Sequence, residues 1–83
     1  MTYNTNSDAL RALPQLLAKR GITHREGYAF DEAWIDQVIH SFETEEPVVS
    51  INYEVILHFT DYEPVNGLLE VRRDGTWAVR TAQ

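Results

Sequence analysis

The sequence predicts an α+β fold: two N-terminal helices packed on a three-stranded antiparallel β-meander, as a two-layer sandwich. Three observations lead to this fold class. A long stretch alternates between apolar and polar residues, a helical apolar pattern precedes it, and a hairpin sequence closes the chain. With 83 residues and no cysteine, we expect one small domain over 1–83 that depends on its apolar core alone.

The stretch from Pro47 to Thr60 carries the strongest pattern. Side chains of a strand alternate between its two faces. The odd positions here are all apolar or aromatic, and they are Val49, Ile51, Tyr53, Val55, Leu57 and Phe59. The even positions are mostly polar. We therefore predict a long strand with its odd face in the core and its even face in solvent.

The N-terminal segment predicts a helix after a loose terminus at residues 1–6. Ser7 is a candidate cap, and Gly21 is a stop signal. Between them, leucines follow at helical spacing: Leu10, Leu13 and Leu17. Pro14 removes one helical hydrogen bond and leaves two alternatives. We favour one kinked helix over 8–20 over a turn at 8–12 followed by a helix from Pro14.

Residues 22–29 alternate in character, with an interruption at Gly27, and form either a short edge strand or an extended connection. We predict only the connection. The second helix is then predicted from Asp31, a good N-cap, with Phe30 and Ile35 placed to form a hydrophobic staple. Its apolar face consists of Trp34, Ile35, Val38, Ile39 and Phe42. The helix is expected to end near Glu43, because the residue before Pro47 favours extended backbone.

A loop of turn-forming residues at 61–67 is expected to lead into strands over 68–72 and 76–81. A two-residue turn at Asp74-Gly75 would pair apolar residues with charged ones. A three-residue loop over 73–75 instead pairs Val71 with Trp77 and Leu69 with Val79. That loop needs a left-handed residue at its third position, which Gly75 supplies, so we predict it.

The net charge of −6 is unevenly distributed along the chain. Residues 26–70 contain eleven acids and no lysine or arginine, so the segments before, within and after this span carry +3, −11 and +2. Such a surface disfavours nucleic acid and anionic membranes as direct partners and favours a basic protein. The alternative is an acidic surface that serves solubility alone.

No motif identifies a catalytic, cofactor-binding or metal-binding site. The histidines His24, His40 and His58 share no ligand spacing, the glycines are isolated, and no serine lies in a nucleophile motif. We therefore expect no enzymatic activity, no cofactor and no metal. The absence of cysteine and of any long apolar run favours a cytoplasmic protein without a leader or membrane span.

We expect a small acidic protein-binding module that inhibits a basic or nucleic-acid-binding protein, as phage or plasmid counter-defence inhibitors and immunity proteins do. The candidate partner-binding residues are Glu43, Glu45, Glu46, Glu54, Ile56, His58, Asp61, Tyr62, Glu63 and Glu70. Tyr62 either contacts the partner or folds back over the core.

Two alternatives to this module stay open. One is a structural subunit that oligomerises, for example as a homodimer through strand edges or a patch of Ile56 and Leu68. The other is a small-molecule-binding or enzymatic domain that acts as a dimer. Its site would lie on the outward sheet face, which also holds Asn52, Arg72, Ala78 and Arg80.

Overall fold

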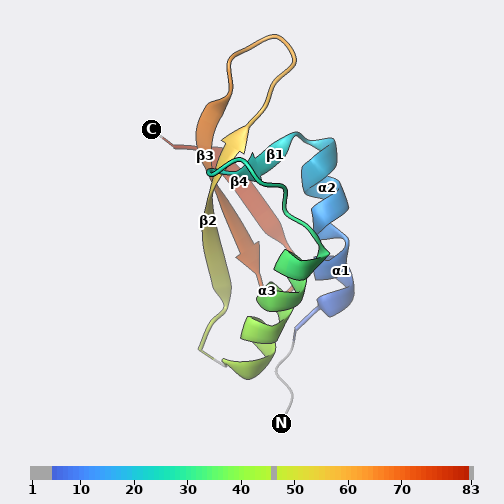
Figure 1. Cartoon of the computed structure of the whole chain (residues 1–83). Coiled ribbons are helices and arrows are strands. Elements are labelled where there is room, and N and C mark those ends of the chain that lie inside the picture. The colour runs from blue at the N-terminus through green and yellow to red at the C-terminus, as the bar shows by residue number, and fades with distance from the viewer. Residues whose placement is uncertain (1–4, 46, 83) are drawn as a thin grey trace.

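The computed structural model describes residues 5–45 and 47–82 (Figure 1). The elements are α1 Ser7–Arg11, α2 Leu13–Lys19, β1 Ile22–His24, α3 Glu32–Thr44, β2 Ser50–Leu57, β3 Val65–Arg72 and β4 Trp77–Thr81. The strands form one antiparallel sheet in the order β1-β2-β3-β4, and the helices lie on one of its faces. The α+β class and the meander are confirmed, but the sheet has four strands where three were predicted.

The additional strand is β1, which corrects the interpretation of residues 22–29 as a connection alone. Ile22 pairs with Leu57 and His24 with Val55. Gly21 adopts a φ of +67°, and its carbonyl accepts a hydrogen bond of 2.9 Å from the N–H of His58. This turn after α2 brings the chain onto the free edge of β2. The alternation of this stretch allowed a strand, but a strand of three residues is too short for the pattern to decide between a strand and a connection.

The N-terminal helix is bent at Ala12, as the kinked alternative predicted. Pro14 lies in the first turn of α2, where its missing N–H costs no hydrogen bond within that helix. The cap is Asn6 and not Ser7, because the Oδ1 of Asn6 accepts from the N–H of Ala9 at 3.2 Å. Of the terminus predicted to be loose, 1–4 lie outside the described residues. Asn6 is fixed, since its N–H donates to the carbonyl of Arg73 at 3.0 Å.

Helix α3 matches its prediction closely. Asp31 caps it by accepting from the N–H of Trp34 at 3.0 Å, and it ends one residue beyond Glu43, at Thr44. Its apolar face closes the core between the helices and the sheet. The buried residues of that core are Leu10, Leu13, Leu17, Ile22, Phe30, Ile35, Val38, Ile39, Phe42, Val55, Leu57, Leu69 and Val71.

Strand β2 is shorter than the predicted stretch of 47–60. Its pairing with β3 begins at Ser50, opposite Arg72, and ends at Leu57, opposite Val65. Val49 and Phe59, both predicted to be core residues, are 67% and 50% exposed. Beyond the last pair the chain leaves the sheet, so alternation alone no longer decides which side chains are buried. Strand β3 in turn begins at Val65, three residues earlier than expected.

The hairpin between β3 and β4 has the predicted register, with Val71 opposite Trp77 and Leu69 opposite Val79. Gly75 adopts a φ of +92° and donates its N–H to the carbonyl of Arg72 at 3.0 Å. Asp74 accepts hydrogen bonds from the hydroxyl and the backbone N–H of Thr76, at 2.6 and 2.9 Å, and these bonds lower the pKa of its carboxyl. The three-residue loop is therefore confirmed.

Candidate functional site

The structure distributes the predicted partner-binding residues over three places. Glu43 and Glu45 lie at the C-terminal end of α3. The outer face of the sheet carries Glu54, Ile56 and Glu70, and His58 directly follows β2. The β2–β3 loop carries Asp61, Tyr62 and Glu63. Glu46 lies outside the described residues. The end of α3 and the β2–β3 loop are at opposite ends of the molecule (Figure 1).

At the end of α3, where these acids lie, the structure places an arginine that the sequence did not identify. Arg73, at the tip of the hairpin, donates from Nη2 to the carbonyl of Glu45 at 2.8 Å and from Nε to the carbonyl of Val48 at 3.1 Å. A cation at the C-terminal end of a helix offsets the negative end of its dipole. The fold itself therefore relieves the unfavourable charge at this helix end, which weakens the case for Glu43 and Glu45 as partner contacts.

Two acids elsewhere in the acidic span of residues 26–70 form ion pairs with arginines from outside it. Asp36 on α3 pairs with Arg11 at 2.6 Å, and the hydrogen bond and charge of Asp36 raise the pKa of Arg11. On the sheet, Arg25 forms an ion pair with Glu54. Because both partners of these two pairs are more than half exposed, each pair adds little stability. They do reduce the negative charge that α3 and the sheet present to a partner.

Three candidates remain on or beside the outer sheet face, and internal contacts partly occupy them. Glu70 accepts a hydrogen bond from Nη2 of Arg72 at 2.9 Å and forms an ion pair with it. The ring Nε2 of His58 lies 3.0 Å from the hydroxyl of Thr23. Ile56 is half-buried, as is Leu68 on the neighbouring strand. Ile56 and Leu68 therefore present only part of their apolar surface on this face.

The β2–β3 loop, residues 58–64, differs from the other two places; we call it the acidic aromatic loop. It projects beyond the sheet and the helices (Figure 1). Tyr62 is 76% exposed, and its ring meets the edge of Phe59 with the ring centroids 6.4 Å apart. Among the described residues, neither Asp61 nor Glu63 has an ion-pair partner. Tyr62 thus points to solvent and does not fold back over the core.

Phe59 is the member of this loop that the sequence did not identify as a site residue. It continues the alternation of β2 and was therefore predicted to be buried. The signal that distinguishes Phe59 is its position two residues before the turn-forming stretch 61–64, which ends the strand. Phe59 also lies beyond Leu57, the last residue of β2 that pairs with β3.

A second group of aromatic rings lies at the start of α3. Phe30 contacts Trp34 and Tyr53, with ring centroids 4.5 and 5.9 Å apart, and His24 stacks on Tyr28 at 4.3 Å. Burial raises the pKa of Tyr53, and the neighbouring indole N–H of Trp34 acts in the opposite direction. Phe30 is part of the buried core, and Trp34 and Tyr53 pack against that core.

Within residues 5–45 and 47–82, no three histidine, aspartate or glutamate side chains are arranged to hold a metal ion. In the same part of the chain, no helix is both long and apolar enough to cross a membrane. Comparisons of the chain with protein-family models, with curated proteins and with solved structures find no match.

Proposed function

We propose that this chain is a small acidic protein-binding module that occupies a basic surface of another protein through the acidic aromatic loop. In this proposal it acts by covering that surface and not by catalysis, as an inhibitor does. The observation that carries the proposal is the exposed ring pair of Phe59 and Tyr62, set beside the exposed carboxylates of Asp61 and Glu63.

The loop offers the groups that a basic surface binds well. A lysine or arginine of the partner can pair with Asp61 or Glu63 and lie over the face of Tyr62 as a cation–π contact. Tyrosine is also among the residues that contribute most to binding energy at protein interfaces. Since residues 58–64 contain no lysine or arginine, nothing in the loop repels a cationic partner.

The same groups explain why a nucleic-acid-binding protein suits the role of partner. Such proteins bind phosphates with basic side chains and bases with stacking side chains. The loop presents carboxylates beside aromatic rings, which are the corresponding anionic and planar groups. It can therefore compete with nucleic acid for a basic, aromatic-lined surface.

The loop is also restrained before it binds. Both of its ends are held by paired strand residues, Leu57 and Val65, and Pro64 fixes one backbone dihedral next to the second end. The contact between Phe59 and Tyr62 orders two side chains that binding would otherwise have to immobilise. Restraint of this kind lowers the entropic cost of association.

Capture from a cell lysate tests the proposal. We expect the immobilised wild-type protein to retain one or more basic proteins at low salt, and the double variant Phe59→Ser/Tyr62→Ser to lose them. Both side chains are at least half exposed, so the variant should fold, and a thermal melt checks this. Quantitative mass spectrometry of the retained proteins is the readout.

The matched control is Tyr28→Ser, which removes a tyrosine of 51% exposure far along the chain from the loop. This variant should retain the same proteins as the wild type. The proposal is contradicted if the wild type retains no protein at low salt. It is equally contradicted if the loop variant retains as much of the same proteins as the Tyr28 variant does.

A further inference from the structure

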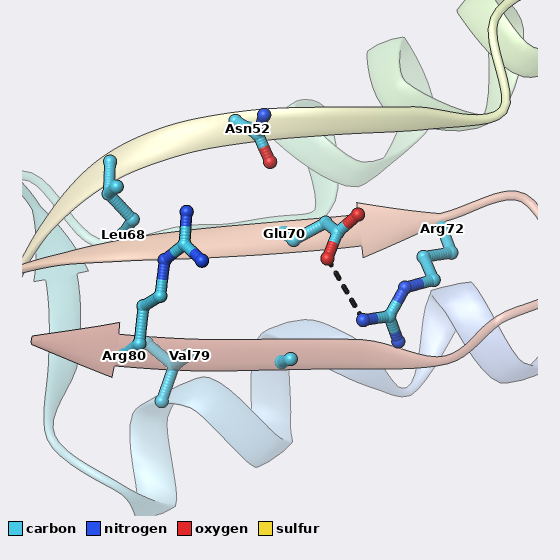
Figure 2. Close-up of a pocket in the computed structure, with 7 residues that line it drawn as sticks. Asn52, Leu68, Glu70, Arg72, Val79 and Arg80 are labelled. Atoms are coloured by element: carbon cyan, nitrogen blue, oxygen red, sulfur yellow. Dashed lines mark hydrogen bonds and ion pairs between the residues drawn. The ribbon is translucent and has the colours of Figure 1, made fainter.

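The outer face of the sheet, on the side away from the helices, contains a shallow hollow of about 360 Å³ (Figure 2). This volume is within the usual range of small-molecule sites. Residues of β2, β3 and β4 line it, and they are Asn52, Leu68, Glu70, Arg72, Ala78, Val79 and Arg80. The hollow is separate from the acidic aromatic loop, so the inference below goes beyond the proposed function.

The two arginine side chains of the hollow differ in their contacts within the protein. Arg72 donates from Nη2 to Glu70 at 2.9 Å and from Nη1 to the hydroxyl of Thr76 at 3.2 Å. The side chain of Arg80 has no hydrogen-bond or ion-pair partner among the described residues. Figure 2 shows its guanidinium lying across β3, between Leu68 and Glu70, toward the middle of the sheet. Its N–H donors are therefore available inside the hollow.

The cross-strand register explains this position of Arg80. Arg80 lies opposite Leu68, and the next pair on the same face is Glu70 opposite Ala78. Leu68 offers no acceptor, and the small side chain of Ala78 leaves room beside the guanidinium. Asn52, opposite Glu70 on β2, adds a side-chain amide at the far wall. The hollow thus combines a charged guanidinium group, a side-chain amide and the apolar surface of Leu68 and Ala78.

The local charge selects the class of ligand. Arg72, Arg80 and Glu70 together carry +1, in a chain whose net charge is −6. A monoanion neutralises this site. A phosphate dianion would leave excess negative charge beside Glu70. A carboxylate also matches the planar fork of arginine with two parallel hydrogen bonds.

We propose that this hollow binds a carboxylate monoanion with an apolar body, with Arg80 as its bidentate donor and with Leu68 and Ala78 beneath the apolar part. The carboxylate belongs either to a small free acid or to the C-terminus of a peptide.

Titration of the ¹⁵N-labelled protein with benzoate, followed by NMR, tests the site. We expect saturable shifts that are largest at residues 52, 68, 78 and 80.

Arg80→Gln should weaken binding by about tenfold, the effect expected for loss of a charge-assisted hydrogen-bond pair. Glu70→Gln should strengthen it, because the nearest negative charge is gone. Lys19→Gln makes the same charge change as Arg80→Gln on the exposed end of α2 and should leave binding unchanged.

A short apolar peptide with a free C-terminus, and the same peptide amidated, distinguish the two sources of the carboxylate. Tighter binding of benzoate indicates a free acid, and tighter binding of the free-ended peptide indicates a C-terminal ligand; either result supports the proposal. Equal binding of the amidated peptide overturns it. So do an unchanged affinity in Arg80→Gln, inorganic phosphate binding more tightly than benzoate, or the absence of saturable shifts with both carboxylates.

Discussion

Replacement of Phe42 by alanine is expected to lower the free energy of unfolding by about 3–5 kcal/mol, as for other large side chains removed from a core. Phe42 has no exposed surface and is the largest fully buried side chain of the described residues. A chain of this length has a total stability of roughly 4–12 kcal/mol. The variant should therefore lose a large part of the total stability of the protein. Urea unfolding followed by circular dichroism measures the change.

Phe59→Ala is the matched control for this prediction. The alternation of β2 predicts that Phe59 is buried, but the structure leaves it half exposed in the acidic aromatic loop. Its truncation should cost less than about 1 kcal/mol. Losses of similar size in the two variants would contradict the assignment of Phe59 to the surface and would place it in the core.

Gly75→Val is expected to destabilise the protein by at least about 2 kcal/mol, through backbone strain and steric overlap together. Gly75 has a φ of +92°, a conformation that β-branched residues avoid. A Cβ at this position would also lie 2.5 Å from the Cβ of Ala9 on α1. Because the hairpin tip and α1 touch here, the substitution disturbs both. A thermal melt should show a decrease of about 8 °C or more.

Gly27→Val separates the two causes. Gly27 has a similar φ of +96°, but a Cβ there would have no atom within 4 Å of it beyond its chain neighbours. This variant should therefore show the backbone strain alone and a clearly smaller decrease in melting temperature. Equal decreases for both variants would show that the contact between Gly75 and Ala9 contributes nothing.

The sequence predicted those parts of the fold that depend on local rules. The cap at Asp31, the face of α3 and the register of the hairpin follow from spacing and turn chemistry, and the structure has them. The ends of β2 and the existence of β1 depend on where a partner strand begins and ends. No pattern within 47–60 or 22–24 carries that information. The ends of β2 were therefore predicted incorrectly, and the connection was preferred to the short edge strand that became β1.

The candidate site was predictable in part for the same reason. Tyr62 and its neighbouring acids stand out in the sequence because they lie in the stretch of turn-forming residues 61–67, which contains a proline and a glycine. The long-range partners of the other acids cannot be recognised in the sequence. Arg25 reaches Glu54, Arg11 reaches Asp36, and Arg73 reaches the carbonyls at the end of α3, all from segments outside the acidic span. Only the fold brings these groups together.

The most direct test of the proposed function compares capture of the basic partner by the wild-type protein and by a variant whose loop carboxylates are neutralised. Asp61→Asn/Glu63→Gln removes two charges from the acidic aromatic loop, and Glu26→Gln/Glu43→Gln removes two exposed charges elsewhere. Capture should be lost in the loop variant and kept in the control. Wild-type capture should fall between about 0.1 M and 1 M salt, as the Debye length shortens from about 10 Å to about 3 Å. Equal loss in both variants, or capture insensitive to salt, would contradict binding through this loop.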